Sequence, residues 1–572
     1  MRIKHFFGLA VIAAMTASCS SNNDLVNGGN GSGEVENGTA YASFKINLPT
    51  TSGTRAAGEP TFDKGDANEY KVNDATLLLF KKDATTGKYQ FKESVDLGNM
   101  EPWTSSSTEG ITTTAKLTAK ITKAEVGSNK GYYALIILNN NSKTAAKITE
   151  PTDGQTYADW SKNADNATVA NYLKHDNGFF MANAPKYVAG APETLVEIKN
   201  IYASKQEAEN STATTVYVER GLAKVSLAST SNEHVDIADG NYAGDHVDIT
   251  GWTLDVTNKK TFPVHVTEGD GLWADTWKAT TTPAATNGAT MDRFHDTKLT
   301  EFQRVYWGLD PNYKKEFATV EACEGEFTMA KTSDFKTGKD AKKAQYCLEN
   351  TFDIAHMMQG QTTRVLFSAK YTPNGFSDGE TFYKMGNSSQ LWNATKVEAQ
   401  IKAKAQEVLG EADASKVTVT LAAEGNDMTK AGVHLVAAAN ITYGTTALAP
   451  EKVDEINAKL GFKKATPTDA EVGLSTFASG VSYYIARVKH FNELTPWNAG
   501  DATYADNNIN WLGRYGVLRN NWYELTVNSV SGPGYPDIPK VKPTDPDDEN
   551  SQYINVSVKI LDWAKRSQDV NL

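Results

Sequence analysis

Two residues near the start of the chain are of types that undergo covalent processing, a cysteine at 19 and an arginine at 55. Cys19 follows a charged stretch and then an apolar stretch within 1–18, which together are typical of an export signal. Small residues precede Cys19 and a polar tether follows it, so the sequence predicts the lipid attachment site of a bacterial lipoprotein. The alternative is an ordinary secretory signal followed by a cysteine without a role.

Arg55 lies in a stretch of small and polar residues, 51–58, of the kind that proteases cut preferentially. Cleavage after Arg55 would make Ala56 the first residue of the mature chain. It would also release everything before that point, including the lipid. The alternative is that a lone arginine in a flexible stretch has no function.

The tetrapeptide HVDI occurs twice, at 234–237 and 246–249, and brings four side chains that can bind metals into a short interval. These side chains are His234, Asp236, His246 and Asp248. A hairpin with alternating polar residues explains them as well, and we predict no metal site.

The remaining residues of chemical interest do not define a site. Trp273 and Trp277 could form a platform for a sugar, but buried or loop-anchoring tryptophans also account for them. Cys323 and Cys347 could pair in an oxidising compartment or stay as two buried thiols. Because the sequence holds no phosphate-binding Gly loop, zinc-protease helix or nucleophile elbow, we expect no cofactor and no enzyme.

The composition limits the partners. The net charge is -12 and the pI is about 5.4, with the Lys and Arg residues dispersed along the chain, so nucleic acid is not an expected partner. After the signal, no window approaches the roughly 20 apolar residues of a membrane-spanning helix. The lipid would therefore be the membrane anchor.

Short runs of β-forming residues alternate with clusters of Gly, Asn, Asp and Thr, and this pattern predicts a mainly β protein built of β-sandwich domains. The predicted strands include 75–80, 132–138, 216–227, 251–256, 364–371, 417–421, 481–488 and 522–530. Apolar residues at helical spacing predict two helices, 394–409 and 451–460. We expect both helices to lie on the sandwich as insertions.

Each end of the chain carries a lone strand in which apolar and polar residues alternate. The apolar residues are Ala42, Phe44, Ile46 and Leu48 near the front, and Ile554, Val556, Val558 and Ile560 near the back. A Pro-rich segment, 531–550, precedes the back strand. Because prolines lack a backbone donor and keep the chain extended, we expect this segment to join no sheet and to separate the last strand from its domain.

A strand beyond a stiff spacer either folds back on its own domain or pairs with a neighbouring subunit, and the sequence leaves both possibilities open. An exposed strand with an apolar face needs a partner in either case. In strand donation, a segment of one subunit completes the sheet of another. The recipient must then lack a strand, and cleavage after Arg55 would remove 41–48.

Several segments together resemble the fimbrillins of Bacteroidota type V pili, most closely the shaft subunit of the minor fimbria. The segments are the Cys19 signal, Arg55-Ala56, VYVERGLAKVS at 216–226, TTRVLFSAKY at 362–371, YYIARV at 483–488, LRNNWYELTVNSVSGPG at 518–534 and INVSVKILDW at 554–563. Their order and spacing carry the resemblance over nearly the whole chain.

The resemblance implies a palmitate-bearing precursor, two transthyretin-like β-sandwich domains with a few inserted helices, and a C-terminal donor strand. Cys19 would carry the lipid, and an arginine-specific surface protease would cut between Arg55 and Ala56. The donor residues would be Ile554, Val556, Val558, Ile560 and Trp563. The implied division is a signal peptide at 1–18, a propeptide at 19–55, sandwich domains at 56–214 and 215–530, a linker at 531–550 and the donor strand at 551–572.

The implied function is that of a structural subunit of a fimbrial shaft, which supports adhesion, biofilm formation and virulence. The implied partners are other copies of the chain, anchor and tip subunits, the protease, and receptors on host or bacterial surfaces. The precursor would sit at the outer membrane through its lipid, and the mature form in the fimbrium on the cell surface. The rival functions are a surface glycan-binding β-sandwich lipoprotein and a glycan hydrolase with two carboxylates on one sheet face.

Overall fold

The structure of the protein is a computed structural model. It describes residues 38–49, 67–98, 104–105, 111–140, 147–163, 172–173, 178–188, 191–229, 231–267, 304–466, 470–490, 513–547 and 554–562. Residues from Gly38 to Leu572 form one compact unit. Several residues with predicted roles lie outside the described residues, namely Cys19, Arg55, Ala56, Trp273, Trp277 and Trp563.

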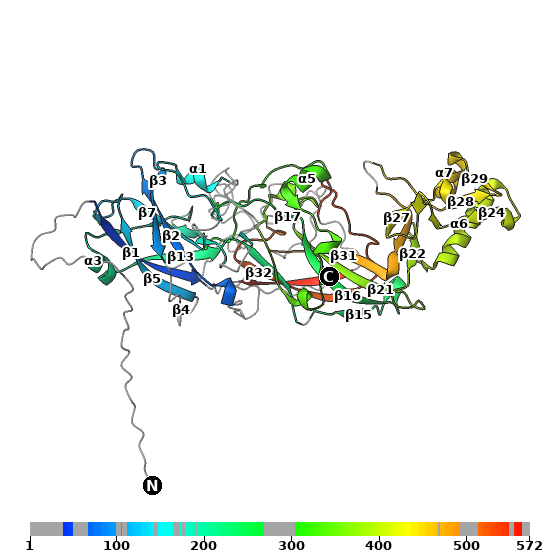
Figure 1. Ribbon diagram of the computed structural model, residues 1–572, viewed down its shortest axis with the longest axis horizontal. Coiled ribbons are helices and arrows are strands. Elements are labelled where there is room, and N and C mark those ends of the chain that lie inside the picture. The colour runs from blue at the N-terminus through cyan, green and yellow to red at the C-terminus, as the bar shows by residue number, and fades with distance from the viewer. Residues whose placement is uncertain are drawn as a thin grey trace, which may run out of the picture. The chain divides into compact units, whose positions relative to one another are not determined.

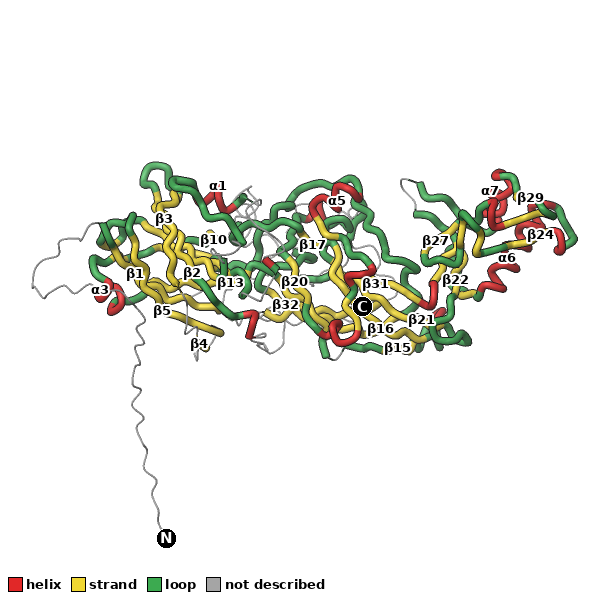
Figure 2. Tube along the Cα trace, viewed as in Figure 1, coloured by secondary structure: helices red, strands yellow, loops and turns green. Residues whose placement is uncertain are grey.

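Strands predominate over helices, as Figure 2 shows, and the mainly β prediction is confirmed. The α-helices are α1 (Tyr157–Ser161), α3 (Lys205–Asn210), α5 (Val320–Glu326), α6 (Ala394–Leu409) and α7 (Pro450–Lys459). None of the helices in the described ranges is long and apolar enough to cross a membrane.

The first part of the chain is built on a nine-stranded sheet (Figure 1). Its strands are β1 (Ala40–Pro49), β2 (Ala75–Lys82), β3 (Tyr89–Gly98), β4 (Thr104–Ser105), β5 (Ile111–Ile121), β7 (Tyr132–Leu138), β8 (Met181–Asn183), β11 (Val196–Glu197) and β13 (Thr214–Arg220). The order along the sheet is β3-β2-β7-β8-β13-β1-β5-β4, with β11 beside β7. Two small pairs accompany it, β6 (Gly127–Ser128) with β12 (Asn200–Ile201), and β9 (Lys186–Val188) with β10 (Ala191–Glu193).

Strands β2 and β7 are buried on both faces. On one face, Leu77 and Ile136 belong to a core that also includes residues of β1, β5 and β13. On the other face, Leu78 and Ile137 pack in a second core together with Trp160 of α1. The continuous apolar runs of these strands follow from this double burial.

The next part of the chain is a sandwich of two sheets, which pack around a core that includes Trp252, Phe367, Tyr484 and Leu525. One sheet has the order β20-β14-β32-β33, and its strands are β14 (Ala223–Leu227), β20 (Gln345–Cys347), β32 (Asn521–Val530) and β33 (Ile554–Asp562). The other has the order β15-β16-β21-β31 with β19 beside β16, and its strands are β15 (His234–Asp236), β16 (His246–Asp255), β19 (Lys336–Thr337), β21 (Arg364–Thr372) and β31 (Val481–Arg487). A small pair joins β17 (Thr257–Asn258) to β18 (Phe327–Thr328).

The predicted strand at 216–227 is two strands, β13 and β14, which belong to different sheets. The break lies at Gly221, where an added Cβ would come within 2.3 Å of the hydroxyl oxygen of buried Tyr172. Strand β13 pairs with β1 and β8 of the first sheet, so the change of sheet falls six residues after Thr215, within the range of about ten residues in which the boundary was expected. The domain boundary itself stays a prediction. A Gly within a run of β-forming residues gave no local sign of a change of sheet.

The two predicted helices do not lie on a sandwich. Helix α6 has the predicted bounds, begins after the capping side chain of Asn393 and ends at left-handed Gly410, and α7 lies one residue before its predicted position. Both pack in a core of their own, which includes Ile401 and Ile456. The strands of this part are β22 (Phe382–Met385), β23 (Leu391–Trp392), β24 (Val417–Val419), β25 (Ala422–Ala423), β26 (Asn426–Asp427), β27 (Gly432–His434), β28 (Ile441–Tyr443), β29 (Thr446–Ala447) and β30 (Leu474–Phe477).

Replacing Gly221 by Ala tests the turn between the two sheets. The new methyl group would overlap the ring of Tyr172, so we expect the free energy of unfolding to fall by about 1–3 kcal/mol. Gly325→Ala is the matched control, because an added Cβ there meets no atom within 4 Å. Denaturant unfolding of the two variants measures the difference, and equal stabilities would contradict the account of this turn.

Candidate functional site

Strand β1, the front strand of the sequence analysis, lies between β5 and β13 (Figure 1). It pairs antiparallel with β5 at ten positions, from Ala40 opposite Ile121 to Pro49 opposite Ile111. It pairs parallel with β13 at four positions, from Phe44 to Asn47. Both edges of the strand are therefore in use, and no residue pattern along the chain predicted β5 or β13 as its partners.

The apolar face of β1 lies in the core of the first part of the chain. Ala42, Phe44, Ile46 and Leu48 are all 0% exposed. With Ala40, these residues supply five of the twenty buried residues of this core. Removing β1 would therefore uncover the apolar side chains of several other strands.

The opposite face of β1 is also largely covered. Ser43 and Asn47 are buried, whereas Lys45 between them is exposed. The Ser43 hydroxyl donates to the carbonyl oxygen of Ala208 in α3 at 2.6 Å, and the Thr114 hydroxyl donates to Asn47 Oδ1 at 2.7 Å. Each of these three positions thus has a distinct environment. A strand that replaced β1 would need side chains that fit these environments.

Phe44→Ala measures how much the first part of the chain depends on β1. Truncating this fully buried ring should lower the free energy of unfolding of the uncleaved precursor by about 3–5 kcal/mol. Lys45→Ala on the exposed face of the same strand should change it by no more than about 0.5 kcal/mol. Thermal or denaturant unfolding compares the two, and a Phe44→Ala loss as small as that of the control would show that β1 is not a core strand.

Strand β33, the back strand of the sequence analysis, pairs antiparallel with β32 at nine positions. The register places Ile560 opposite Tyr523, Val558 opposite Leu525 and Ile554 opposite Val530. In the described residues β33 lies at the end of its sheet and pairs with β32 alone. Of the two possibilities that the sequence left open, the isolated chain adopts the one in which the strand folds back.

The sequence predicted that the Pro-rich segment before β33 is a free spacer. In the structure, this segment is bound to the rest of the chain. Tyr535 exchanges two backbone hydrogen bonds with Tyr483 of β31, of 2.9 and 2.8 Å. The Pro539 carbonyl oxygen accepts from Arg364 at 2.7 Å. The prolines exclude a continuous ladder, but single bridges between them still fix the segment as far as Asp547.

Asp547 is the last described residue of this segment and is 0% exposed. Its carboxylate accepts from Arg487 Nε of β31 at 3.0 Å, and its backbone N–H donates to the Met357 carbonyl oxygen. Burial raises the pKa of Asp547, against the opposing effect of Arg487 and Arg364. We call the contacts of Tyr535, Pro539 and Asp547 the tail root.

Asp547→Ala tests the tail root. The substitution removes the carboxylate that balances the charge of buried Arg487, so we expect a loss of about 3–5 kcal/mol in the free energy of unfolding. Asp545→Ala is the matched control in the same segment, because Asp545 pairs only with partly exposed Lys542 and should contribute about 0–1 kcal/mol. Similar losses in the two variants would argue against a structural role of the buried pair.

Buried charges occupy the place where β13 passes into β14. Glu219 of β13 lies 2.7 Å from His265 Nδ1 and 2.7 Å from Arg304 Nη2, and all three side chains are buried. Burial alone would raise the pKa of Glu219, but the charges of His265 and Arg304 outweigh it and lower the pKa. A paired cluster of this kind tolerates little change of geometry.

A second group of polar contacts joins the same place to the C-terminal sheet. Arg220 donates to the Glu69 carbonyl oxygen at 2.7 Å and to Asn520 Oδ1 at 3.2 Å. Lys224 of β14 lies 2.7 Å from the Glu69 carboxylate and 3.7 Å from the centre of the Trp522 ring. Apart from Glu69, these residues belong to the segments VYVERGLAKVS and LRNNWYELTVNSVSGPG, on which the resemblance rests.

The repeated HVDI segments form a hairpin of β15 and β16, with His234 opposite Asp248 and Asp236 opposite His246. His234 Nδ1 lies 2.6 Å from Asp248 Oδ1, and this hydrogen bond raises the pKa of His234. Over the described ranges, no group of three or more His, Cys, Asp or Glu side chains is arranged to hold a metal ion.

Cys323 and Cys347 are free thiols and lie in different cores. Burial raises the pKa of Cys323 to about 11 and that of Cys347 to about 12. Neither is a reactive thiolate at neutral pH.

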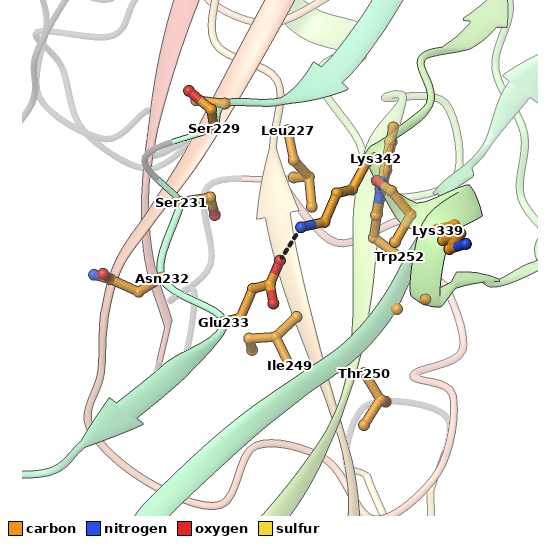
Figure 3. Close-up of a pocket in the computed structure, with 14 residues that line it drawn as sticks. Leu227, Ser229, Ser231, Asn232, Glu233, Ile249, Thr250, Trp252, Lys339 and Lys342 are labelled. Atoms are coloured by element: carbon orange, nitrogen blue, oxygen red, sulfur yellow. Dashed lines mark hydrogen bonds and ion pairs between the residues drawn. The ribbon is translucent and has the colours of Figure 1, made fainter.

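A cavity of about 580 Å³ opens beside the end of β14 (Figure 3). Figure 3 shows an ion pair between Glu233 and Lys342 across it, with an N–O distance of 3.2 Å. Trp252 in its wall is fully buried, and its indole N–H donates to the Ala341 carbonyl oxygen. The ring therefore offers no exposed face on which a sugar could stack.

Comparison with known proteins identifies the C-terminal segment. Residues 475–569 match the family model described as major fimbrial subunit protein type IV, fimbrillin, C-terminal. The matched segment contains β31, β32, the tail root and β33. The resemblance found in the sequence is thereby confirmed for this segment, which is similar to the C-terminal part of major fimbrial subunits.

Comparison with solved structures gives distant similarities. A fimbrilin (fimA) from Porphyromonas gingivalis W83 superposes with a TM-score of 0.36 and 13% identity, covering 94% of this chain and 100% of that one. A fimbrial assembly protein from Parabacteroides distasonis ATCC 8503 has a TM-score of 0.25 and 13% identity, covering 59% and 87%. A comparison with curated proteins gives no significant match.

Proposed function

We propose that the chain is the shaft subunit of a surface fimbria and that it polymerises by strand exchange. In this proposal the precursor is lipidated at Cys19 and held at the outer membrane. An arginine-specific surface protease cuts between Arg55 and Ala56, and β1 leaves with the propeptide. The strand 554–562 of a neighbouring copy then takes the place of β1.

The position of β1 is the observation that carries the proposal. The strand pairs on both edges, with β5 and with β13, and supplies a quarter of the core of the first part of the chain. A subunit without it would have an unpaired edge on each of β5 and β13 and an uncovered apolar core, which is an unstable and aggregation-prone state. The open place between β5 and β13 would therefore bind another strand with the same alternation of apolar and polar residues.

The number of paired positions favours the exchange. In the isolated chain β33 pairs at nine positions and on one edge only. In the place of β1, nine residues would pair with β5 along one edge and at four positions with β13 along the other. Each additional backbone hydrogen bond contributes about 0.5–1.5 kcal/mol net, which helps to offset the uncovering of β32.

The tail root limits how far the donated strand can reach. Asp547 is anchored to its own domain, so only 548–553 separate the root from β33. Seven residue steps from Asp547 to Ile554 span at most about 25 Å. In the neighbouring subunit, the place left by β1 must therefore lie within that distance of Asp547. This favours a fibre in which adjacent subunits are in close contact.

The other elements of the proposal follow from the same family. Anchor and tip subunits would end the fibre, and the shaft would serve adhesion, biofilm formation and virulence through receptors on host or bacterial surfaces. The mature form would reside on the cell surface in the fimbrium.

Two variants of the full-length precursor test the proposal after treatment with an arginine-specific protease. Arg55→Ala should stay uncleaved at this site and monomeric, whereas the control Thr54→Ala should be cleaved and polymerise. A precursor that lacks 553–572 should be cleaved but form no homopolymer. Size-exclusion chromatography and electron microscopy detect the polymer. Normal fibres from Arg55→Ala would contradict cleavage-dependent assembly, and normal fibres from the shortened chain would contradict strand donation.

A further inference from the structure

We propose the register of the exchange: the neighbour's strand enters with Ser557 in the place of Ser43, Lys559 in the place of Lys45 and Ile560 in the place of Ile46. This inference rests on the proposed function and adds to it the pairing of individual residues. Each incoming residue must fit the surroundings of the β1 residue that it replaces.

The two strands share a short sequence. The residues Ser43-Phe44-Lys45-Ile46 of β1 correspond to Ser557-Val558-Lys559-Ile560 of the tail, with three identities in four positions. A shift by one residue would turn the apolar residues to the opposite face, so only shifts by two compete.

The polar face of β1 distinguishes these registers. The Ser43 hydroxyl is buried, bonds to the Ala208 carbonyl oxygen at 2.6 Å and lies 2.9 Å from the Thr118 hydroxyl. Lys45 is exposed. In the proposed register a serine again meets the two partners of Ser43 and a lysine again meets solvent.

The apolar face accepts the same register. Ile560 repeats Ile46, which is 0% exposed. Val558 is smaller than Phe44, whereas Val556 is larger than Ala42. The side-chain volume lost at position 44 is therefore partly regained at the adjacent apolar position 42. The mismatch falls on Asp562 in the place of Leu48, which is 0% exposed and lies one position before the end of the ladder with β5, so this register buries one carboxylate.

The competing register moves the tail by two residues, so that Ile560 takes the place of Leu48. Lys559 then takes the place of Asn47, which is 1% exposed and precedes Leu48 in the ladder, and Asn555 takes that of Ser43. Placing an ammonium group in this buried position carries a large desolvation penalty. The proposed register leaves Lys559 in solvent, and its own cost is the carboxylate of Asp562 next to the end of the strand.

Cross-linking within the cleaved polymer tests the register. Lys45 of β1 lies opposite exposed Lys116 of β5. In the double variant Lys116→Cys with Lys559→Cys, a short thiol cross-linker should join neighbouring subunits into ladders. In Lys116→Cys with Ser557→Cys it should join at least tenfold fewer. Native Cys323 and Cys347 are buried, and single-cysteine variants control for them. A polymer that cross-links through 557, or through neither position, overturns the proposal.

Two single substitutions give a second readout. Ser557→Ala should lower the dissociation temperature of the polymer by several degrees, because Ala cannot bond to the partners of Ser43, whereas Lys559→Ala should leave it unchanged. The competing register predicts no change for Ser557→Ala, because that side chain would be exposed, and a rise for Lys559→Ala, because a buried ammonium group would be removed. Failure of the unmodified precursor to polymerise would instead contradict the proposed function.

Discussion

A strand that pairs on both edges and is covered on both faces cannot be left out of a sheet without a replacement, and β1 is such a strand. It lies between β5 and β13, its apolar residues are fully buried, and α3 accepts a hydrogen bond from its polar face. Without a strand in this place, the core of the first part of the chain would be uncovered. The proposed cleavage and the proposed donation are two consequences of that constraint.

The path from this place to the C-terminal strand is short. The parallel partner of β1 is β13, which continues through Gly221 into β14, and β14 is the parallel partner of β32. Buried contacts of Glu219 and Arg220 fix the passage between the two sheets. A pull on a donated tail would therefore be transmitted from the tail root through the C-terminal sheet to the strand that binds the next tail.

Local pattern predicted the elements whose signals are local. Alternation in 41–48 and 554–560 predicted β1 and β33, and the cap at Asn393 with Gly410 marks both ends of α6. The division at Gly221 could not be predicted, because it depends on which sheets the two halves of an unbroken β pattern join. Each contact of the tail root joins residues far apart in the sequence, such as Arg487 and Asp547. In the sequence, Arg487 stood out only as part of the segment YYIARV, one of the segments that carry the fimbrillin resemblance.

The central claim is that assembled subunits have lost β1 and hold a neighbour's strand in its place. The most direct measurement is the N-terminal residue of subunits isolated from surface fibres, together with a mass spectrum of their peptides. The account predicts Ala56 as the first residue and no peptide from 40–49. Subunits that begin at a lipidated Cys19, or that retain 40–49 within the fibre, would contradict it.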